Sequence, residues 1–159
     1  MVSVASATAS AVERPAFREE ILKDFLVAAA LHQLDRVRGF IETLGLHPDS
    51  TFGGKPTALC YAVLKPCPCL MDYLLSRGAD INRADKMGMT PLHYAAMGGS
   101  EYCLASLIAN GGTLNRYNRL GKTPLALTMD KPHLKGVREL LLCHGALLHE
   151  AEPRAPRFH

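Results

Sequence analysis

Apolar residues recur along the chain in short blocks with helical spacing, and glycine, proline and polar residues separate the blocks. The first block follows an i, i+3, i+4 spacing and consists of Ile21, Leu22, Phe25, Leu26, Ala28 and Ala29. It predicts a helix that begins near residues 14–15. A second helix is predicted over residues 34–42. Further on, Leu92, Ala95 and Ala96 form another apolar stripe, so the pattern predicts an all-α chain of short helices.

The blocks repeat with a fixed period. Thr57, Thr90 and Thr123 recur at equal intervals, and Leu59 and Leu92 are separated by the same interval. Such regularity indicates an internal repeat. The predicted repeats span about 18–50, 52–84, 85–117 and 118–149, within one domain over residues 14–149. Residues 1–13 are predicted to be a disordered tail, and the Pro-rich residues 150–159 a flexible one.

The third repeat carries the most informative motif. It contains Gly88, a Thr-Pro-Leu-His run from Thr90 to His93, the Ala95-Ala96 pair, Gly99 and Gly111-Gly112. This segment resembles an ankyrin repeat. The resemblance implies an all-α solenoid of stacked helix-turn-helix units with hairpin-like loops. It also implies that His93 makes structural hydrogen bonds between repeats.

The outer repeats depart from this motif. In the first, Asp24 and Val27 stand where the family has Thr and His, as is common in a terminal repeat. In the fourth, Ala126 replaces the histidine and Thr128-Met129 replaces the alanine pair, which should weaken helix packing. One residue is inserted, and we expect it within residues 130–135. No capping repeat is expected to cover residues 140–142, so the fourth repeat is predicted to be the least stable.

Composition narrows the setting of the protein. The net charge is +3, too small to imply nucleic acid as a partner. The five cysteines have no disulfide-framework spacing, and neither a signal peptide nor a membrane span is apparent, so we expect a cytoplasmic or nuclear protein. Cys60, Cys103 and Cys143 are predicted to be small core residues.

Candidate catalytic chemistry is weak in this sequence. Cys67 and Cys69 flank a proline, but they lack the second pair of ligands that a zinc site needs. Residues 53–55 lack the spacing of a phosphate-binding loop and are predicted to form a glycine-rich hairpin tip. No nucleophile with a neighbouring base can be proposed from spacing. We therefore predict no enzymatic activity, no cofactor and no metal.

The expected function is protein binding. Similar ankyrin proteins bind partners through the loops between repeats and the faces of the first helices. The predicted partner-binding residues here are Lys86, Met87, Met89, Tyr94, Met97, Arg119, Leu120 and Lys122. Because basic and apolar side chains are interleaved in this set, we expect an acidic, partly apolar protein as partner. We expect the chain alone to be a monomer.

Two alternatives stay open, and one modification is predicted. The chain could be a substrate-recognition subunit of a ubiquitin ligase related to ankyrin proteins with a suppressor-of-cytokine-signalling box, although we expect that box to be absent. It could also be a transcriptional regulator with a nuclear partner. Residues 74–82 resemble ankyrin sequences modified by the oxygen-sensing asparaginyl hydroxylase, which predicts hydroxylation of Asn82. Alternatively, Asn82 only ties its loop through side-chain hydrogen bonds.

Overall fold

The computed structural model describes residues 15–148, and the two predicted tails lie outside this range. Between these limits every regular element is helical, as predicted. In chain order the elements are α2 (Pro15–Ala30), α3 (Leu34–Glu42), α4 (Ala58–Leu64), α5 (Pro68–Ser76), α6 (Pro91–Gly98), α7 (Glu101–Ala109), the 3₁₀ helices η2 (Ala126–Thr128) and η3 (Pro132–Leu134), and α8 (Lys135–Cys143).

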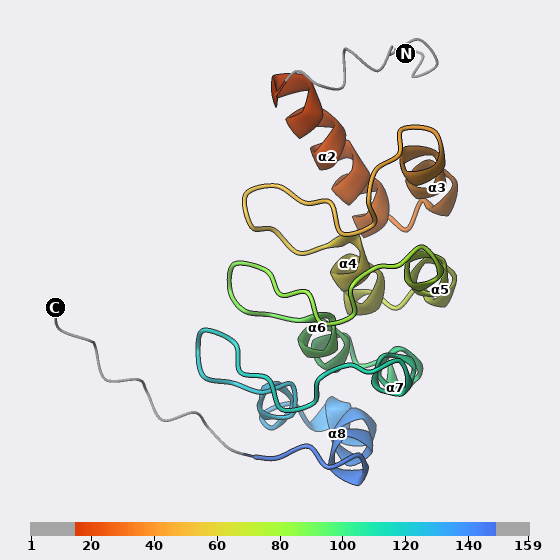
Figure 1. Ribbon diagram of the computed structural model, residues 1–159. Helices are drawn as coiled ribbons and strands as arrows, with labels where there is room; N and C mark the ends of the chain where they lie inside the picture. Colours follow the sequence, from red (N-terminus) through yellow and green to blue (C-terminus); the bar gives the residue numbers. More distant parts are fainter. Residues whose placement is uncertain (1–14, 149–159) are drawn as a thin grey trace, which may run out of the picture.

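The helices stack in two columns (Figure 1). The inner column contains α4 and α6, with α2 packed on α4 and η2 packed on α6. The outer column runs from α3 through α5 and α7 to α8. Three long loops, near residues 50–56, 83–89 and 116–122, project from the inner column toward the same side. The molecule is therefore an all-α solenoid whose loops form one edge.

Local sequence signals set where several helices begin. Pro68 and Pro91 occupy the first helical positions of α5 and α6, where a missing N–H costs nothing. At the start of α7, the Ser100 hydroxyl accepts a hydrogen bond of 3.2 Å from the Cys103 amide. Gly99 has a φ of +77° and reverses the chain between α6 and α7. These signals produce the short helix-turn-helix units.

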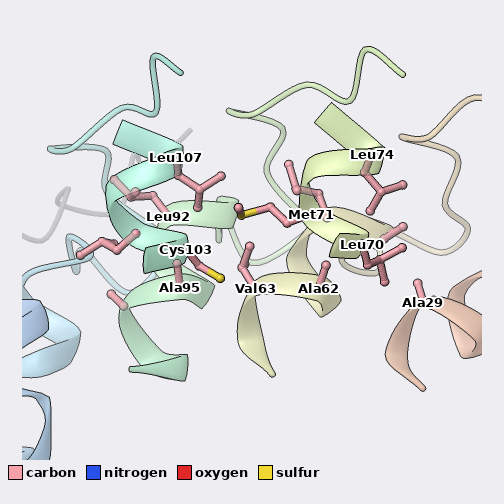
Figure 2. Packing of buried hydrophobic residues seen from close by; sticks show 14 of the residues in the cluster. Ala29, Ala62, Val63, Leu70, Met71, Leu74, Leu92, Ala95, Cys103 and Leu107 are labelled. Carbon is pink, nitrogen blue, oxygen red and sulfur yellow. The ribbon is translucent and has the colours of Figure 1, made fainter. Parts of the chain in front are cut away.

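One hydrophobic core runs through the whole stack. Figure 2 shows small side chains, Ala62 and Ala95, on the inner helices and larger ones, Met71 and Leu107, on the outer helices. Gly98 is also essential to the close approach of α4 and α6, because a Cβ there would lie 2.5 Å from the Leu64 carbonyl oxygen. Small residues on the inner column thus let neighbouring units approach closely.

Two sequence expectations about apolar positions need correction. Cys60 and Cys103 are buried as predicted, but Cys143, the last residue of α8, is exposed because the helical period turns it away from the buried Val137 and Leu141. The leucines of residues 140–142 are not uniformly exposed. Leu141 is fully buried, whereas Leu142 is 47% exposed. The helical period turns these neighbours to opposite faces.

The fourth repeat differs from the others in its first helix. Where the third repeat has the α-helix α6, the fourth has only the single 3₁₀ turn η2. A second 3₁₀ turn, η3, occupies residues 132–134, inside the segment where the insertion was expected. The fourth repeat therefore differs from the third in the length of its first helix, which was not predicted.

Within residues 15–148, no helix combines the length and the apolar character that crossing a membrane requires.

Candidate protein-binding surface

The three projecting loops, called fingers here, are hydrogen-bonded internally and to one another. The second finger closes through the Asp85 amide and the Met89 carbonyl at 3.1 Å. Between fingers, the Lys86 amide donates to the Gly54 carbonyl at 2.9 Å, and the Arg119 amide donates to the Met87 carbonyl at 2.9 Å. The three fingertips therefore form one continuous edge rather than independent loops.

Two side chains that the sequence analysis missed shape the fingers. Asp85 Oδ1 accepts from the Met87 and Met89 amides, at 2.8 and 2.9 Å. Asn118 Oδ1 accepts from the amides of Leu120 and Lys122, at 2.9 and 3.0 Å. Asp85 and Asn118 occupy equivalent positions in successive repeats, and both are types that stabilise turns in this way. Their equivalent positions in two successive repeats could have identified them from the sequence as turn-stabilising residues.

Four of the eight predicted binding residues lie exposed on neighbouring fingertips. Met87 is 42% exposed and Leu120 is 70% exposed. Each directly follows an exposed basic residue, Lys86 or Arg119. A basic-apolar pair is thus repeated on the second and third fingertips, which the Arg119–Met87 hydrogen bond holds together.

The other four predicted residues are half-buried. The Met89 sulfur accepts from Asn118 Nδ2 at 3.2 Å. The Tyr94 hydroxyl donates to Asp85 Oδ2 at 2.6 Å. The pKa of Tyr94 is raised, mainly by burial and next by this hydrogen bond. Met97 lies on the same helix, α6, and Lys122 lies at the base of the third finger. Met89 and Tyr94 therefore support the second and third fingers through Asp85 and Asn118.

His93 connects the third repeat to the next finger, as the family resemblance implied. It is fully buried, and its Nδ1 accepts from the Thr90 amide at 3.1 Å and lies 2.8 Å from the Thr90 hydroxyl. Nδ1 as acceptor places the proton on Nε2, which donates to the Lys122 carbonyl at 3.1 Å. Burial lowers the pKa of His93, so the neutral ring is favoured.

Asn82 ties two repeats together through both ends of its side-chain amide. Its Nδ2 donates to the Gly111 carbonyl at 3.0 Å, and its Oδ1 accepts from the Thr113 amide at 2.8 Å. Asn115 makes the equivalent pair of bonds further along the chain, to residues 145 and 147. In the first repeat, Asp49 accepts from the Asp80 amide. Asp49 was not predicted as a linking residue, although it occupies the position of Asn82 one repeat earlier.

In the part of the chain that the structure describes, no three His, Cys, Asp or Glu side chains gather so as to hold a metal ion. Burial raises the pKa of the Cys60 thiol to about 12, which leaves it protonated and unreactive at neutral pH.

Comparison with known proteins agrees with the architecture. The family model for ankyrin repeats (3 copies) matches residues 59–151, more than half of the chain. A 49-residue stretch is 43% identical to the potassium channel AKT1 of Arabidopsis thaliana, and it covers 31% of this chain and 6% of that channel. The chain thus matches only a small part of that relative's length. Ankyrin repeats are generally protein–protein interaction modules, and the family is typically non-catalytic. The chain belongs to the ankyrin repeat family.

Proposed function

We propose that this protein is a non-catalytic adaptor or scaffold that binds a partner protein through its fingertips and the adjoining face of α6. The observation that carries the proposal is the repeated basic-apolar pair on two hydrogen-bonded fingertips. Met87 and Leu120 are large apolar side chains held in solvent by a rigid turn. Rigid exposed apolar residues bind with little loss of conformational entropy.

The charges beside these residues favour an acidic partner. Lys86 and Arg119 are exposed and lie next to Met87 and Leu120 on the neighbouring tips. Basic side chains at the rim of an interface chiefly steer association and set orientation, whereas desolvated apolar side chains supply most of the affinity. A surface of this kind can bury about 800 Å² on one partner, which is typical of a stable complex.

The thiols favour a reducing compartment. All five cysteines are free, and two of them, Cys69 and Cys143, are exposed. Exposed free thiols persist best where glutathione and thioredoxin keep them reduced. Cytosolic and nuclear extracts are therefore the appropriate sources of partner for the test.

The test compares the wild-type chain with the double variant Met87→Ala/Leu120→Ala. Partners are captured from cytosolic and nuclear extracts, identified by mass spectrometry, and then purified for binding kinetics. We expect the double variant to weaken binding by about 1–3 kcal/mol, mainly through faster dissociation. The variant Lys86→Glu/Arg119→Glu should chiefly slow association, and salt should reduce its difference from wild type.

The matched control is Leu142→Ala, because Leu142 is similarly exposed but lies on α8, away from the fingers. It should leave binding unchanged. If Leu142→Ala weakens binding and the fingertip variants do not, the partner binds the end of the stack and the proposed surface is wrong.

A further inference from the structure

A polar hollow of about 290 Å³ lies between α2 and the bases of the first two fingers. Arg18 and Leu22 of α2 form one wall, and residues 47–51 lead into the first finger along another. Arg83, at the start of the second finger, completes the lining of the hollow. The fold therefore brings together two arginines that are far apart in the sequence, and neither belongs to the predicted binding set.

The hollow carries excess positive charge. Among the described residues, neither the Arg18 nor the Arg83 guanidinium forms a hydrogen bond or an ion pair. Asp49 supplies the carboxylate of the lining, but both of its oxygens accept from the Asp80 amide, at 3.1 and 3.0 Å. The Asp49 side chain is only 7% exposed. The carboxylate thus already has a donor, and its Oδ2 also lies 3.7 Å from His47 Nδ1, so the lining holds two guanidiniums and one carboxylate.

Asp49 also orients the third potential donor, His47. The Asp49 amide donates to His47 Nδ1 at 3.2 Å, so a neutral His47 ring carries its proton on Nε2. The His47 side chain is 67% exposed, which leaves Nε2 free to donate to a ligand. The Thr51 hydroxyl donates to the Lys55 carbonyl at 2.9 Å and is already used. Ser50 contributes a further hydroxyl to the lining.

We propose that this hollow binds a phosphoryl group, carried either by a phosphorylated side chain of a partner segment or by inorganic phosphate. Guanidinium groups form paired hydrogen bonds with phosphate oxygens, and two arginines line the hollow. The imidazole and the Ser50 hydroxyl add donors for remaining oxygens. A carboxylate has only two oxygens and one negative charge, so it satisfies this donor set less completely. The site is separate from the fingertip surface and does not depend on that surface binding a partner.

The experiment titrates the ¹⁵N-labelled full chain with four probes while amide NMR signals are followed. The probes are a short alanine peptide with one phosphoserine, the same peptide with serine, the same peptide with glutamate, and inorganic phosphate. We expect saturable shifts at the amides of His47, Asp49, Ser50 and Thr51 with the phosphoserine peptide and none with the serine peptide. If inorganic phosphate binds as tightly as the phosphopeptide, the free ion is the source of the phosphoryl group.

The variants Arg18→Gln and Arg83→Gln should each weaken phosphopeptide binding by about tenfold, because each removes a charge-assisted pair of hydrogen bonds. Both side chains are exposed, so these variants are expected to fold, and the amide spectrum checks this. The matched control is Arg116→Gln, since Arg116 occupies the position of Arg83 in the next repeat and does not line the hollow. Met87→Ala/Leu120→Ala should also bind the phosphopeptide normally.

Three results would overturn the proposal. One is the absence of saturable shifts with both the phosphoserine peptide and inorganic phosphate. Another is equal binding of the glutamate peptide, which would make the hollow a carboxylate site. The third is an equal loss in Arg116→Gln, which would attribute binding to net charge. Failure of the fingertip variants to affect a partner would leave all of these readouts unchanged, so the two proposals fail independently.

Discussion

The third and fourth repeats begin with the same Thr-Pro-Leu run, yet they fold differently. In the third repeat, His93 follows the run, and it links Thr90 in its own repeat to the Lys122 carbonyl in the next finger. In the fourth, Ala126 takes that position and makes no side-chain hydrogen bond. There, the Thr123 hydroxyl instead accepts from the Ala126 amide at 3.2 Å. The fourth repeat keeps a helix start but lacks the link to a neighbouring unit.

The second difference is the alanine pair. Ala95 and Ala96 are fully buried and sustain α6 over residues 91–98. The fourth repeat has Thr128 and Met129, and the buried Thr128 hydroxyl donates to the Leu125 carbonyl at 2.7 Å. Such local bonding competes with α-helix continuation. The helix ends there after one 3₁₀ turn.

A residue of α8 then adds hydrogen bonds to carbonyl groups at and just beyond the end of the shortened helix, two of which also accept from backbone amides. Arg138 Nη2 donates to the carbonyls of Thr128, Met129 and Lys131, at 2.6, 3.2 and 3.2 Å. Once the inserted residue is allowed for, its counterpart in the third repeat is the fully buried Leu104. The Thr-Pro-Leu motif that the two repeats share thus specifies where a repeat helix begins. The histidine and the alanines after it decide whether the helix continues and couples to its neighbour.

The largest effect is expected for His93→Ala. This change leaves the Thr90 amide without an acceptor in a buried site, and the Lys122 carbonyl keeps only its bond from the Asn118 amide. One unsatisfied buried group costs about 1–3 kcal/mol, and the cavity left by the fully buried ring adds to this, so we expect a loss of about 2–4 kcal/mol in the free energy of unfolding. Urea denaturation followed by circular dichroism measures it.

The control for this variant is His133→Ala, at an exposed position of the fourth repeat. It should change the free energy of unfolding by less than about 0.5 kcal/mol. Equal losses in the two variants would mean that the link between the third and fourth repeats contributes nothing specific.

Arg138→Ala is expected to destabilise mainly the fourth repeat. It removes the charged donor from three carbonyl groups at and just beyond the end of η2, although the Thr128 and Lys131 carbonyls keep a backbone amide donor. Hydrogen bonds to a charged donor are worth about 1.5–3 kcal/mol. We expect a loss of about 1–3 kcal/mol and faster amide exchange confined to residues 118–148. Arg36→Ala, on an exposed face of α3, is the control. Loss of protection spread evenly over the stack would contradict a local role for Arg138.

In the wild-type chain, the third and fourth repeats should differ in the rate of amide hydrogen exchange. Amides of residues 118–148 should exchange fastest among the repeats, and those of residues 85–117 slowest, because the third repeat has packed neighbours on both sides. We expect the opening free energies to differ by about 1–2 kcal/mol, within the range known for local unfolding. Uniform protection would show that the whole stack unfolds as one unit. Protection in the fourth repeat that rises with protein concentration would instead indicate self-association through Leu142 and its neighbours.

Low pH should weaken the hydrogen-bonded link between the third and fourth repeats by protonating His93. Burial lowers the pKa of His93 in the folded state below its ordinary value of 6.5, so the unfolded state binds a proton more readily. Stability contributed by the neutral ring is therefore intact above pH 6.5 and declines as the pH falls from there toward the folded-state pKa. The measurement is unfolding free energy against pH in wild type and His93→Gln. If both curves have the same slope below pH 6.5, His93 does not carry the effect.

Much of this architecture could be predicted from the sequence, because the constant repeat period and the Thr-Pro-Leu-His run report local helix starts and close packing. The exposure of Met87 and Leu120 followed from their place on turns. The role of Arg138 could not be predicted, because an arginine at a core position gives no hint of which carbonyls it will reach. The hollow at Arg18 and Arg83 was also missed, since it depends on how three segments meet in space.

The smallest expected effect on stability comes from hydroxylation of Asn82. The predicted reaction adds one oxygen atom at the side chain, where the amide already bonds to Gly111 and Thr113. Because those bonds use the amide rather than the side-chain carbon, the change in unfolding free energy should stay within about 0.5 kcal/mol. Asn115 provides the internal comparison. It makes similar bonds but follows Thr113-Leu114, where Asn82 follows Asp80-Ile81, so it should be the poorer substrate. After incubation with the asparaginyl hydroxylase, mass spectrometry should find the added oxygen on the Asn82 peptide. The same peptide of Asn82→Ala should carry no added oxygen. No modification there, or modification confined to Asn115, would leave Asn82 with its structural role alone.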